Sequence, residues 1–197
     1  VGNDSTISEW LINYSGGFTR RGIIGQISIY FAKYFNLNLR DSILIFQILI
    51  LMIYFISLYY FLRDIKINKI IILAIFTPIF ILYPVAEIEV LARKEIFIFC
   101  FYLFYLFLNK NIYRFYYKLL LLPLAVLIWE PVIFFLMFFL VLDIIEIKSK
   151  KLDFDLMKIL SSYIPTIILV FYIALNPLDS NGHAVMAKNL MMNFNET

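Results

Sequence analysis

The sequence is poor in cysteine, histidine and charge. It has one cysteine, Cys100, among 197 residues, which excludes an internal disulfide framework and a cysteine-based metal site. It has one histidine, His183, in a polar C-terminal stretch without cysteines or paired acids. We therefore expect no metal site, and we expect His183 at the surface. Charged residues make up 16% of the chain, where about 25% is usual, and this excludes a disordered chain and a nucleic-acid binder.

Apolar residues, in contrast, are abundant. They make up 63% of the chain, against about 45–50% in soluble domains, and the mean hydropathy is +0.88. A soluble domain of this size buries only about 70% of the surface of its unfolded chain, so it could not hide so many apolar side chains. A soluble enzyme is therefore excluded. We expect an all-α, polytopic integral membrane helix bundle of about four to six membrane helices, some short or re-entrant.

Apolar runs of different length mark the candidate spans. Residues 42–62 contain no formal charge and are the clearest span, because about 20 helical residues cross a bilayer core of about 30 Å. The other apolar runs are residues 70–84, 96–108, 119–142 and 159–175. The run at 119–142 is interrupted by Trp129-Glu130-Pro131, where proline removes a backbone donor and breaks the helix.

The distribution of lysine and arginine predicts the orientation of these spans. Ten of the seventeen basic residues lie in three connecting segments, at residues 63–69, 109–118 and 143–158. If all three are cytoplasmic, residues 119–142 start and finish on one side, as two half-helices broken at Glu130-Pro131. The alternative is one long kinked span, which would put residues 143–158 outside. Both interpretations place residues 1–41 and 85–95 outside, and the first also places residues 176–197 there.

We therefore expect three regions: an external amphipathic segment at 1–41, a membrane region at 42–175, and a polar, external loop at 176–197. Residue 1 is valine and the last region has no closing element, so we expect a piece of a longer polytopic protein or a processed chain. The external segment predicts a helix that lies in the membrane surface. Its apolar face is Ile23, Ile24, Ile27, Tyr30, Phe31, Tyr34 and Phe35, and its polar side is Gln26, Ser28 and Lys33.

Arg20 and Arg21 precede that helix beside flexible glycine backbone. Guanidinium groups bind phosphate through paired hydrogen bonds, and backbone N–H groups at a helix start add to such a site. The alternative is that both arginines anchor the helix to lipid headgroups. Asp4 or Glu9 could act as a general base at the membrane surface, although Asp4 could instead cap a helix that starts near residue 5.

The connector at residues 85–95 is the densest group of charges near a membrane run. Glu89 and Arg93 are four residues apart and face each other on a helix, while Glu87 and Lys94 lie on other sides. Charged residues that dip into a membrane are expected to be functional, and the alternative is a solvated loop with an internal ion pair.

Glu130 is the one acid deep in an apolar run. Its functional roles could be that of a proton carrier or of a hydrogen-bond partner for sugar or lipid headgroups. The structural alternative is that its carboxyl group binds the backbone donors freed beside Pro131.

The segment from Tyr14 to Gly25, YSGGFTRRGIIG, resembles a GGF-x-RRG-x-x-G pattern of bacterial polytopic proteins of surface-polysaccharide synthesis. The motifs at residues 92–95 (ARKE) and 129–131 (WEP) match charged positions of that group, and the resemblance covers residues 1–142. The layout also resembles membrane glycosyltransferases of the GT-C type. The resemblance implies a polyprenyl-phosphate-linked sugar donor, membrane lipid as a partner, and a location in the bacterial inner (cytoplasmic) membrane, in synthesis of the cell envelope.

The leading hypothesis is glycosyl transfer or polysaccharide polymerisation at the external membrane face. A carboxylate, from Asp4, Glu87 or Glu89, deprotonates the acceptor hydroxyl. The leaving phosphate is held by basic residues, namely Arg20, Arg21, Arg93 and Lys94. The alternative is a transporter or flippase segment in which Glu130 and the broken helix line the pathway, and a third hypothesis is a purely structural subunit.

Overall fold

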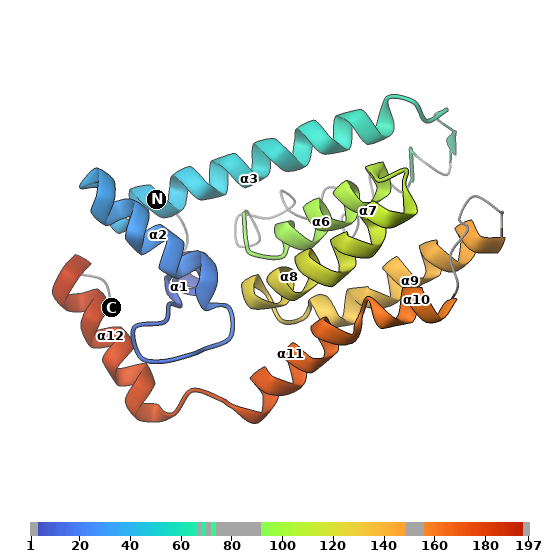
Figure 1. Cartoon of the computed structure of the whole chain (residues 1–197). Coiled ribbons are helices and arrows are strands. Elements are labelled where there is room, and N and C mark those ends of the chain that lie inside the picture. Colours follow the sequence, from blue (N-terminus) through green and yellow to red (C-terminus); the bar gives the residue numbers. More distant parts are fainter. Residues whose placement is uncertain (1–3, 67, 70–71, 74–91, 149–155, 195–197) are drawn as a thin grey trace.

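The computed structural model describes residues 4–66, 68–69, 72–73, 92–148 and 156–194, and every regular element in these ranges is a helix. Figure 1 shows most of the helices running lengthwise beside one another, with α1, α2 and α12 gathered at one end. The helices are α1 (Asp4–Leu11), α2 (Gly22–Phe35), α3 (Leu39–Leu62), α6 (Ile96–Phe107), α7 (Asn111–Tyr116), the π-helix η1 (Tyr117–Leu121), α8 (Leu122–Ile128), α9 (Val132–Lys148), α10 (Leu156–Ser161), α11 (Ile164–Leu175) and α12 (Ser180–Phe194).

Three helices of the described residues are long and apolar enough to cross a membrane: Leu39–Leu62, Asn111–Ile128 and Leu156–Leu175. The first is α3, which has 24 residues and is therefore about 36 Å long. It begins three residues before the span predicted at 42–62. The predicted run at 96–108 is α6, a shorter apolar helix of 12 residues, whereas the run at 70–84 lies outside the described residues except at positions 72 and 73.

The predicted break at Glu130-Pro131 separates two helices that run in opposite directions (Figure 1). One continuous helix extends from Asn111 to Ile128 and the other, α9, from Val132 to Lys148. We call this pair of helices the hairpin. Both are longer than the half-helices predicted within residues 119–142. Residues 109–118, predicted as a basic connecting segment, contribute α7 and the start of η1.

A buried ion pair joins the two helices of this hairpin. Lys118 and Asp143 were both predicted in connecting segments, but their side chains are 2% and 1% exposed and Nζ lies 2.5 Å from Oδ2. Mutual neutralisation lets both charges enter the helix bundle instead of remaining at the headgroups.

Helix α2 forms where residues 23–35 predict a helix, but its buried face differs from the prediction. The residues buried in α2 are mostly small: Gly22, Gly25, Ser28, Ile29 and Ala32. Ser28, predicted on the polar outer side, packs against α3, and Ser42 Oγ donates to its carbonyl oxygen at 2.9 Å. Small side chains allow this close approach, so Tyr30 and Tyr34 are left outside, 65% and 81% exposed.

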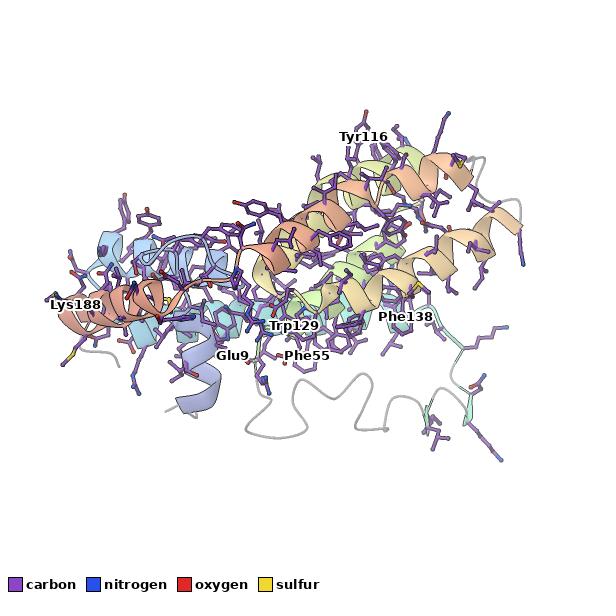
Figure 2. The ribbon with its side chains drawn as sticks, turned by 90° about the horizontal axis from the view of Figure 1, so that it is seen from below. Glu9, Phe55, Tyr116, Trp129, Phe138 and Lys188 are labelled. Carbon is purple, nitrogen blue, oxygen red and sulfur yellow. The ribbon has the colours of Figure 1, made fainter. Side chains whose placement is uncertain are left out.

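Two hydrophobic clusters make up the interior. The first joins α1, α2, α3 and α12 to α6, and the second joins α6 to η1, α8, α9, α10 and α11. Figure 2 shows how far the helices extend, with Lys188 of α12 and Phe138 of α9 well apart. The region at 176–197, predicted as a polar loop, contains α12 over Ser180–Phe194, because Met186 and Leu190 pack into the first cluster.

Candidate functional site

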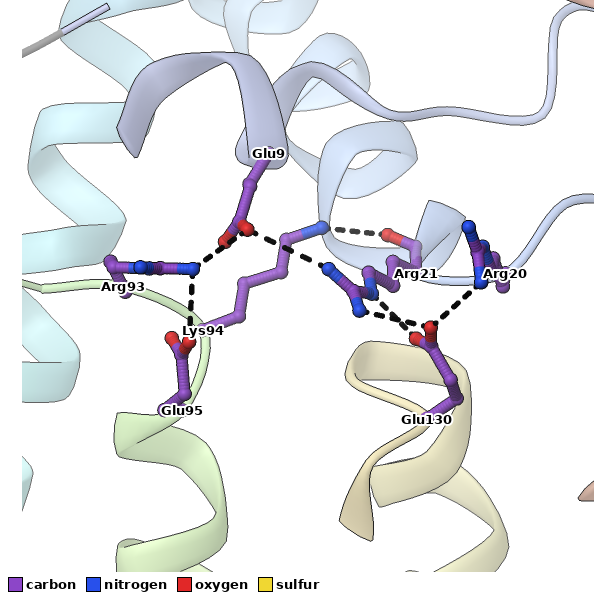
Figure 3. A network of polar contacts seen from close by, with 7 residues as sticks. All are labelled: Glu9, Arg20, Arg21, Arg93, Lys94, Glu95 and Glu130. Atoms are coloured by element: carbon purple, nitrogen blue, oxygen red, sulfur yellow. Dashed lines mark hydrogen bonds and ion pairs between the residues drawn. The ribbon is translucent and has the colours of Figure 1, made fainter. Parts of the chain in front are cut away.

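Seven charged side chains from distant parts of the sequence meet where α1, α2, α6 and the turn between α8 and α9 come together (Figure 3). We call this group the charged cluster. It combines four basic side chains and three carboxylates, and its members are Glu9, Arg20, Arg21, Arg93, Lys94, Glu95 and Glu130.

Glu130 binds both arginines of the segment before α2. Arg21 donates to it twice, from Nε to Oε2 at 2.5 Å and from Nη2 to Oε1 at 2.9 Å. Arg20 donates from Nη1 to Oε1 at 3.3 Å. The paired contact with Arg21 is the geometry in which guanidinium binds carboxylate or phosphate most strongly, and it raises the pKa of Arg21 above its usual value.

Glu9 links the two basic segments. Its Oε1 accepts a hydrogen bond from Arg93 Nη2 at 3.0 Å and lies 3.6 Å from Arg21 Nη1. Arg93 also pairs with Glu95, Nη2 to Oε1, at 3.1 Å. Burial raises the pKa of Glu95, because a carboxylate removed from water favours its neutral form. Arg93 therefore pairs with Glu9 and Glu95; its predicted helical partner, Glu89, lies outside the described residues.

Lys94 lies in the middle of the cluster (Figure 3). Its side chain has no exposed surface, and Nζ donates to the backbone carbonyl oxygen of Arg21 at 2.7 Å. Burial lowers the pKa of Lys94 to about 7, although the nearby carboxylates of Glu9, Glu130 and Glu95 act in the opposite direction.

Two residues of this region have a left-handed backbone conformation that side-chain-bearing residues rarely adopt. Arg21 has φ of 62° and Ala92 has φ of 55°. Each carbonyl group accepts side-chain hydrogen bonds from a distant segment: Arg21 from Lys94, and Ala92 from Trp10 Nε1 at 3.2 Å and Gln47 Nε2 at 3.5 Å. Such strained residues occur preferentially at functional sites, where the surrounding structure holds them in place.

The glycines around Arg20 and Arg21 are required by close packing. A Cβ atom on Gly22 would lie 2.5 Å from the ring of Tyr14, and one on Gly25 would overlap the backbone carbonyl of Ile12. Gly16 faces the backbone of Gly182 in α12 equally closely. The glycine pattern therefore fixes how the arginine segment folds against α1 and α12.

Three helices begin at the charged cluster. Arg21 directly precedes α2, Glu95 directly precedes α6, and Glu130 lies two residues before the first residue of α9. Helix N-termini carry partial positive charge, so these three add to the field of the basic side chains. Arg20 is 68% exposed and Arg93 is 34% exposed, and exposed guanidinium groups beside helix N-termini are the kind of groups that bind anions.

An apolar cavity of about 450 Å³ lies between α3, α6 and α9. Its lining includes Tyr54, Ile98, Phe99, Phe135 and Phe138. Ile98 follows Glu95 by three residues and Phe135 follows Glu130 by five. Ile98 and Phe135 therefore lie in the first turns of α6 and α9, so the near end of the cavity is lined by the starts of two helices that begin at the charged cluster.

A second polar group lies at the other end of the hairpin. Asp143 accepts hydrogen bonds from Lys118, from Tyr163 at 3.3 Å, and from Tyr105. Asp143 is 13 residues along from Glu130, which corresponds to about 20 Å of helix. Because three side-chain donors already bind the Asp143 carboxylate, we interpret this polar group as a contact that stabilises the fold.

The charged cluster brings together six of the candidate residues from the sequence analysis, namely Glu9, Arg20, Arg21, Arg93, Lys94 and Glu130. Of the candidate bases, Glu9 lies in the cluster, whereas the side chain of Asp4 and residues Glu87 and Glu89 lie outside the described part of the chain.

Glu95 and the Trp10–Ala92 contact were missed by the sequence analysis. No local spacing relates Trp10 to Ala92, which are 82 residues apart. Among the described residues, no three His, Cys, Asp or Glu side chains are grouped so that they could hold a metal ion.

Comparison with protein-family models, with curated proteins and with solved structures gives no match to this chain. The functional assignment therefore rests on the geometry of the charged cluster and the apolar cavity beside it.

Proposed function

We propose that this chain belongs to a polytopic membrane glycosyltransferase or polysaccharide polymerase that uses a polyprenyl-phosphate-linked sugar at the external face of the bacterial cytoplasmic membrane. The observation that carries the proposal is that Arg20, Arg21 and Arg93 belong to one charged cluster at three helix N-termini, beside an apolar cavity. An amphiphilic anion needs both parts: guanidinium groups and helix N-termini bind phosphate, and an apolar cavity buries hydrocarbon.

In this proposal the phosphate of the donor replaces Glu130 as the partner of Arg20 and Arg21. Phosphate offers the same paired acceptors as a carboxylate. The Glu130 side chain is 20% exposed and lies in the turn between α8 and α9, from which it can move away. Arg93 lies across the cluster and contributes a further guanidinium. The prenyl chain extends into the cavity between α3, α6 and α9.

The chemical step is a substitution at the anomeric carbon of the donor sugar. The acceptor oxygen forms a bond to that carbon while the bond from carbon to the phosphate oxygen breaks. The phosphate leaves with the electron pair, and the arginines stabilise its charge. A carboxylate takes the acceptor proton; we assign this role to Asp4, Glu87 or Glu89, which lie close in sequence to cluster residues Glu9 and Arg93.

The external surface in this proposal is the end of the bundle that carries α2 and α12. Tyr30 and Tyr34 of α2 are well exposed, and tyrosines are enriched at the level of lipid headgroups. Transport along a pathway lined by Glu130 is less favoured, because Glu130 lies at the turn of the hairpin and both its oxygens bind arginine.

Binding of a lipid-linked sugar tests the anion site. The whole chain, in lipid nanodiscs, is titrated with polyprenyl phosphoglucose, and Arg20→Ala, Arg21→Ala and Arg93→Ala are compared with Lys188→Ala, which changes an exposed lysine of α12. We expect each arginine variant to bind at least tenfold more weakly, as for the loss of a charged hydrogen bond, and Lys188→Ala to bind as wild type. Equal affinity in all four variants would remove the phosphate role.

Polymer synthesis tests the activity itself. In cells that depend on the full-length protein, Arg20→Ala or Arg93→Ala is expected to abolish polymer export while the protein still inserts into the membrane. Wild-type polymer levels in both variants would contradict the proposal.

A further inference from the structure

Lys94 differs from the arginines of the charged cluster in having no surface at which a ligand could arrive. Its side chain is 0% exposed, and its Nζ is held 2.7 Å from the carbonyl oxygen of Arg21. Arg20, Arg21 and Arg93 are 68%, 22% and 34% exposed. The sequence predicted that Lys94 binds phosphate directly, but its buried position does not favour that role. Any effect of Lys94 on a bound anion must therefore act through a neighbouring residue.

That neighbour is Arg21, whose backbone is strained. Its φ of 62° is left-handed, a conformation that costs about 1 kcal/mol or more for a residue with a side chain. Arg21 directly precedes α2, and the hydrogen bond from Lys94 ties its carbonyl group to a segment 73 residues away in the sequence. With this backbone fixed, the Arg21 guanidinium reaches both Glu130 and Glu9.

We propose that Lys94 is a positioning residue that holds Arg21 in its left-handed conformation and so directs the Arg21 guanidinium to the anion site. The inference rests on the proposed function, since it assumes that Arg21 binds an anion. Ala92 is a second case of a left-handed residue whose carbonyl group is held by a distant side chain, because Trp10 Nε1 donates a hydrogen bond to its carbonyl oxygen.

The charge of Lys94 and its hydrogen bond can be separated experimentally. The charged groups that act on it are Glu9 of α1, Glu130 of the α8–α9 turn, and Arg21 and Glu95 beside it. Because burial lowers its pKa to about 7, most of the amine is neutral at pH 8.5. A neutral amine still has N–H donors, so at this pH Lys94→Met removes the hydrogen bond and little charge.

A double-mutant cycle at pH 8.5 tests the inference. Wild type, Lys94→Met, Arg21→Ala and the double variant are titrated in nanodiscs with polyprenyl phosphoglucose, whose phosphodiester keeps one negative charge. We expect Lys94→Met to weaken binding about tenfold when Arg21 is present and less than twofold when Arg21 is alanine. Lys188→Met is the matched control and should bind as wild type. If Lys94→Met prevents folding, Lys94→Ala takes its place in the cycle.

The results separate the two proposals. An unchanged affinity in Lys94→Met, or an equal loss with and without Arg21, overturns the positioning role. An unchanged affinity in Arg21→Ala alone overturns the proposed anion site. Lys94→Gln keeps an N–H donor one bond nearer the backbone, and it should bind at least threefold more tightly than Lys94→Met; equal affinities would contradict the role of the hydrogen bond.

Discussion

Arg21 and Glu130 are 109 residues apart in the sequence, yet Arg21 Nε donates to Glu130 Oε2 at 2.5 Å and Nη2 donates to Oε1 at 2.9 Å. This contact joins the segment before α2 to the turn of the α8–α9 hairpin. It neutralises the arginine that we assign to phosphate binding, so the carboxylate and an incoming anion compete for the same guanidinium.

Glu130→Gln tests this competition. The amide is a weaker partner for Arg21 than the carboxylate, so we expect binding of polyprenyl phosphoglucose to become about threefold to tenfold tighter. The free energy of unfolding should fall by about 1–3 kcal/mol, since a partly buried charged hydrogen bond is lost. Both are measured on the same nanodisc preparation. Glu146→Gln is the control: it weakens the pair with Arg114 at the other end of the hairpin and should lower stability alone. Weaker anion binding by Glu130→Gln would show that the carboxylate assists the ligand instead of competing with it.

Ala92→Gly tests the backbone strain beside the cluster. The φ of 55° at Ala92 is unfavourable for alanine and accessible to glycine. We expect the free energy of unfolding to rise by about 0.5–1 kcal/mol, with anion affinity unchanged. Ala32→Gly, within α2, is the comparison and should be destabilising by about 1 kcal/mol. A loss of stability in both variants would mean that Ala92 is not strained.

Lys94 predicts a pH dependence of stability. Its pKa in the folded protein is about 7, below the usual value of 10.5. Between these two values the unfolded chain binds a proton that the folded chain has released, so stability increases as the pH rises from about 7 to about 10. Chemical unfolding from pH 6.5 to 9.5 should show this increase in wild type, and it should be smaller in Lys94→Met. The same slope in both proteins would show that Lys94 is not the titrating group.

The buried pair of Lys118 and Asp143 predicts non-additive effects on stability. Lys118→Met leaves the Asp143 carboxylate buried with two tyrosine donors, and we expect a loss of about 3–5 kcal/mol. In Lys118→Met with Asp143→Leu no charge remains, and most of that loss should be recovered. Thermal unfolding in detergent measures both. Additive losses would indicate that the two residues act separately.

The sequence by itself was enough to locate two of the apolar helices and the break between two others. Residues 42–62 and 96–108 predicted α3 and α6 to within a few residues, because a long uncharged apolar run is a local property of the chain. The break at Glu130-Pro131 was equally local, since proline removes a donor wherever it occurs. The sequence also singled out Arg20, Arg21, Arg93, Lys94 and Glu130 as charges beside apolar runs.

Tertiary structure decided which of these charges meet. Nothing in local spacing relates Arg21 to Glu130, Lys94 to the Arg21 carbonyl, or Lys118 to Asp143. The face of α2 that packs was also set by its neighbour: α3 approaches so closely that small residues such as Ser28 face it. Hydropathy records how readily a residue leaves water, but the partner of a buried charge depends on how the helices pack.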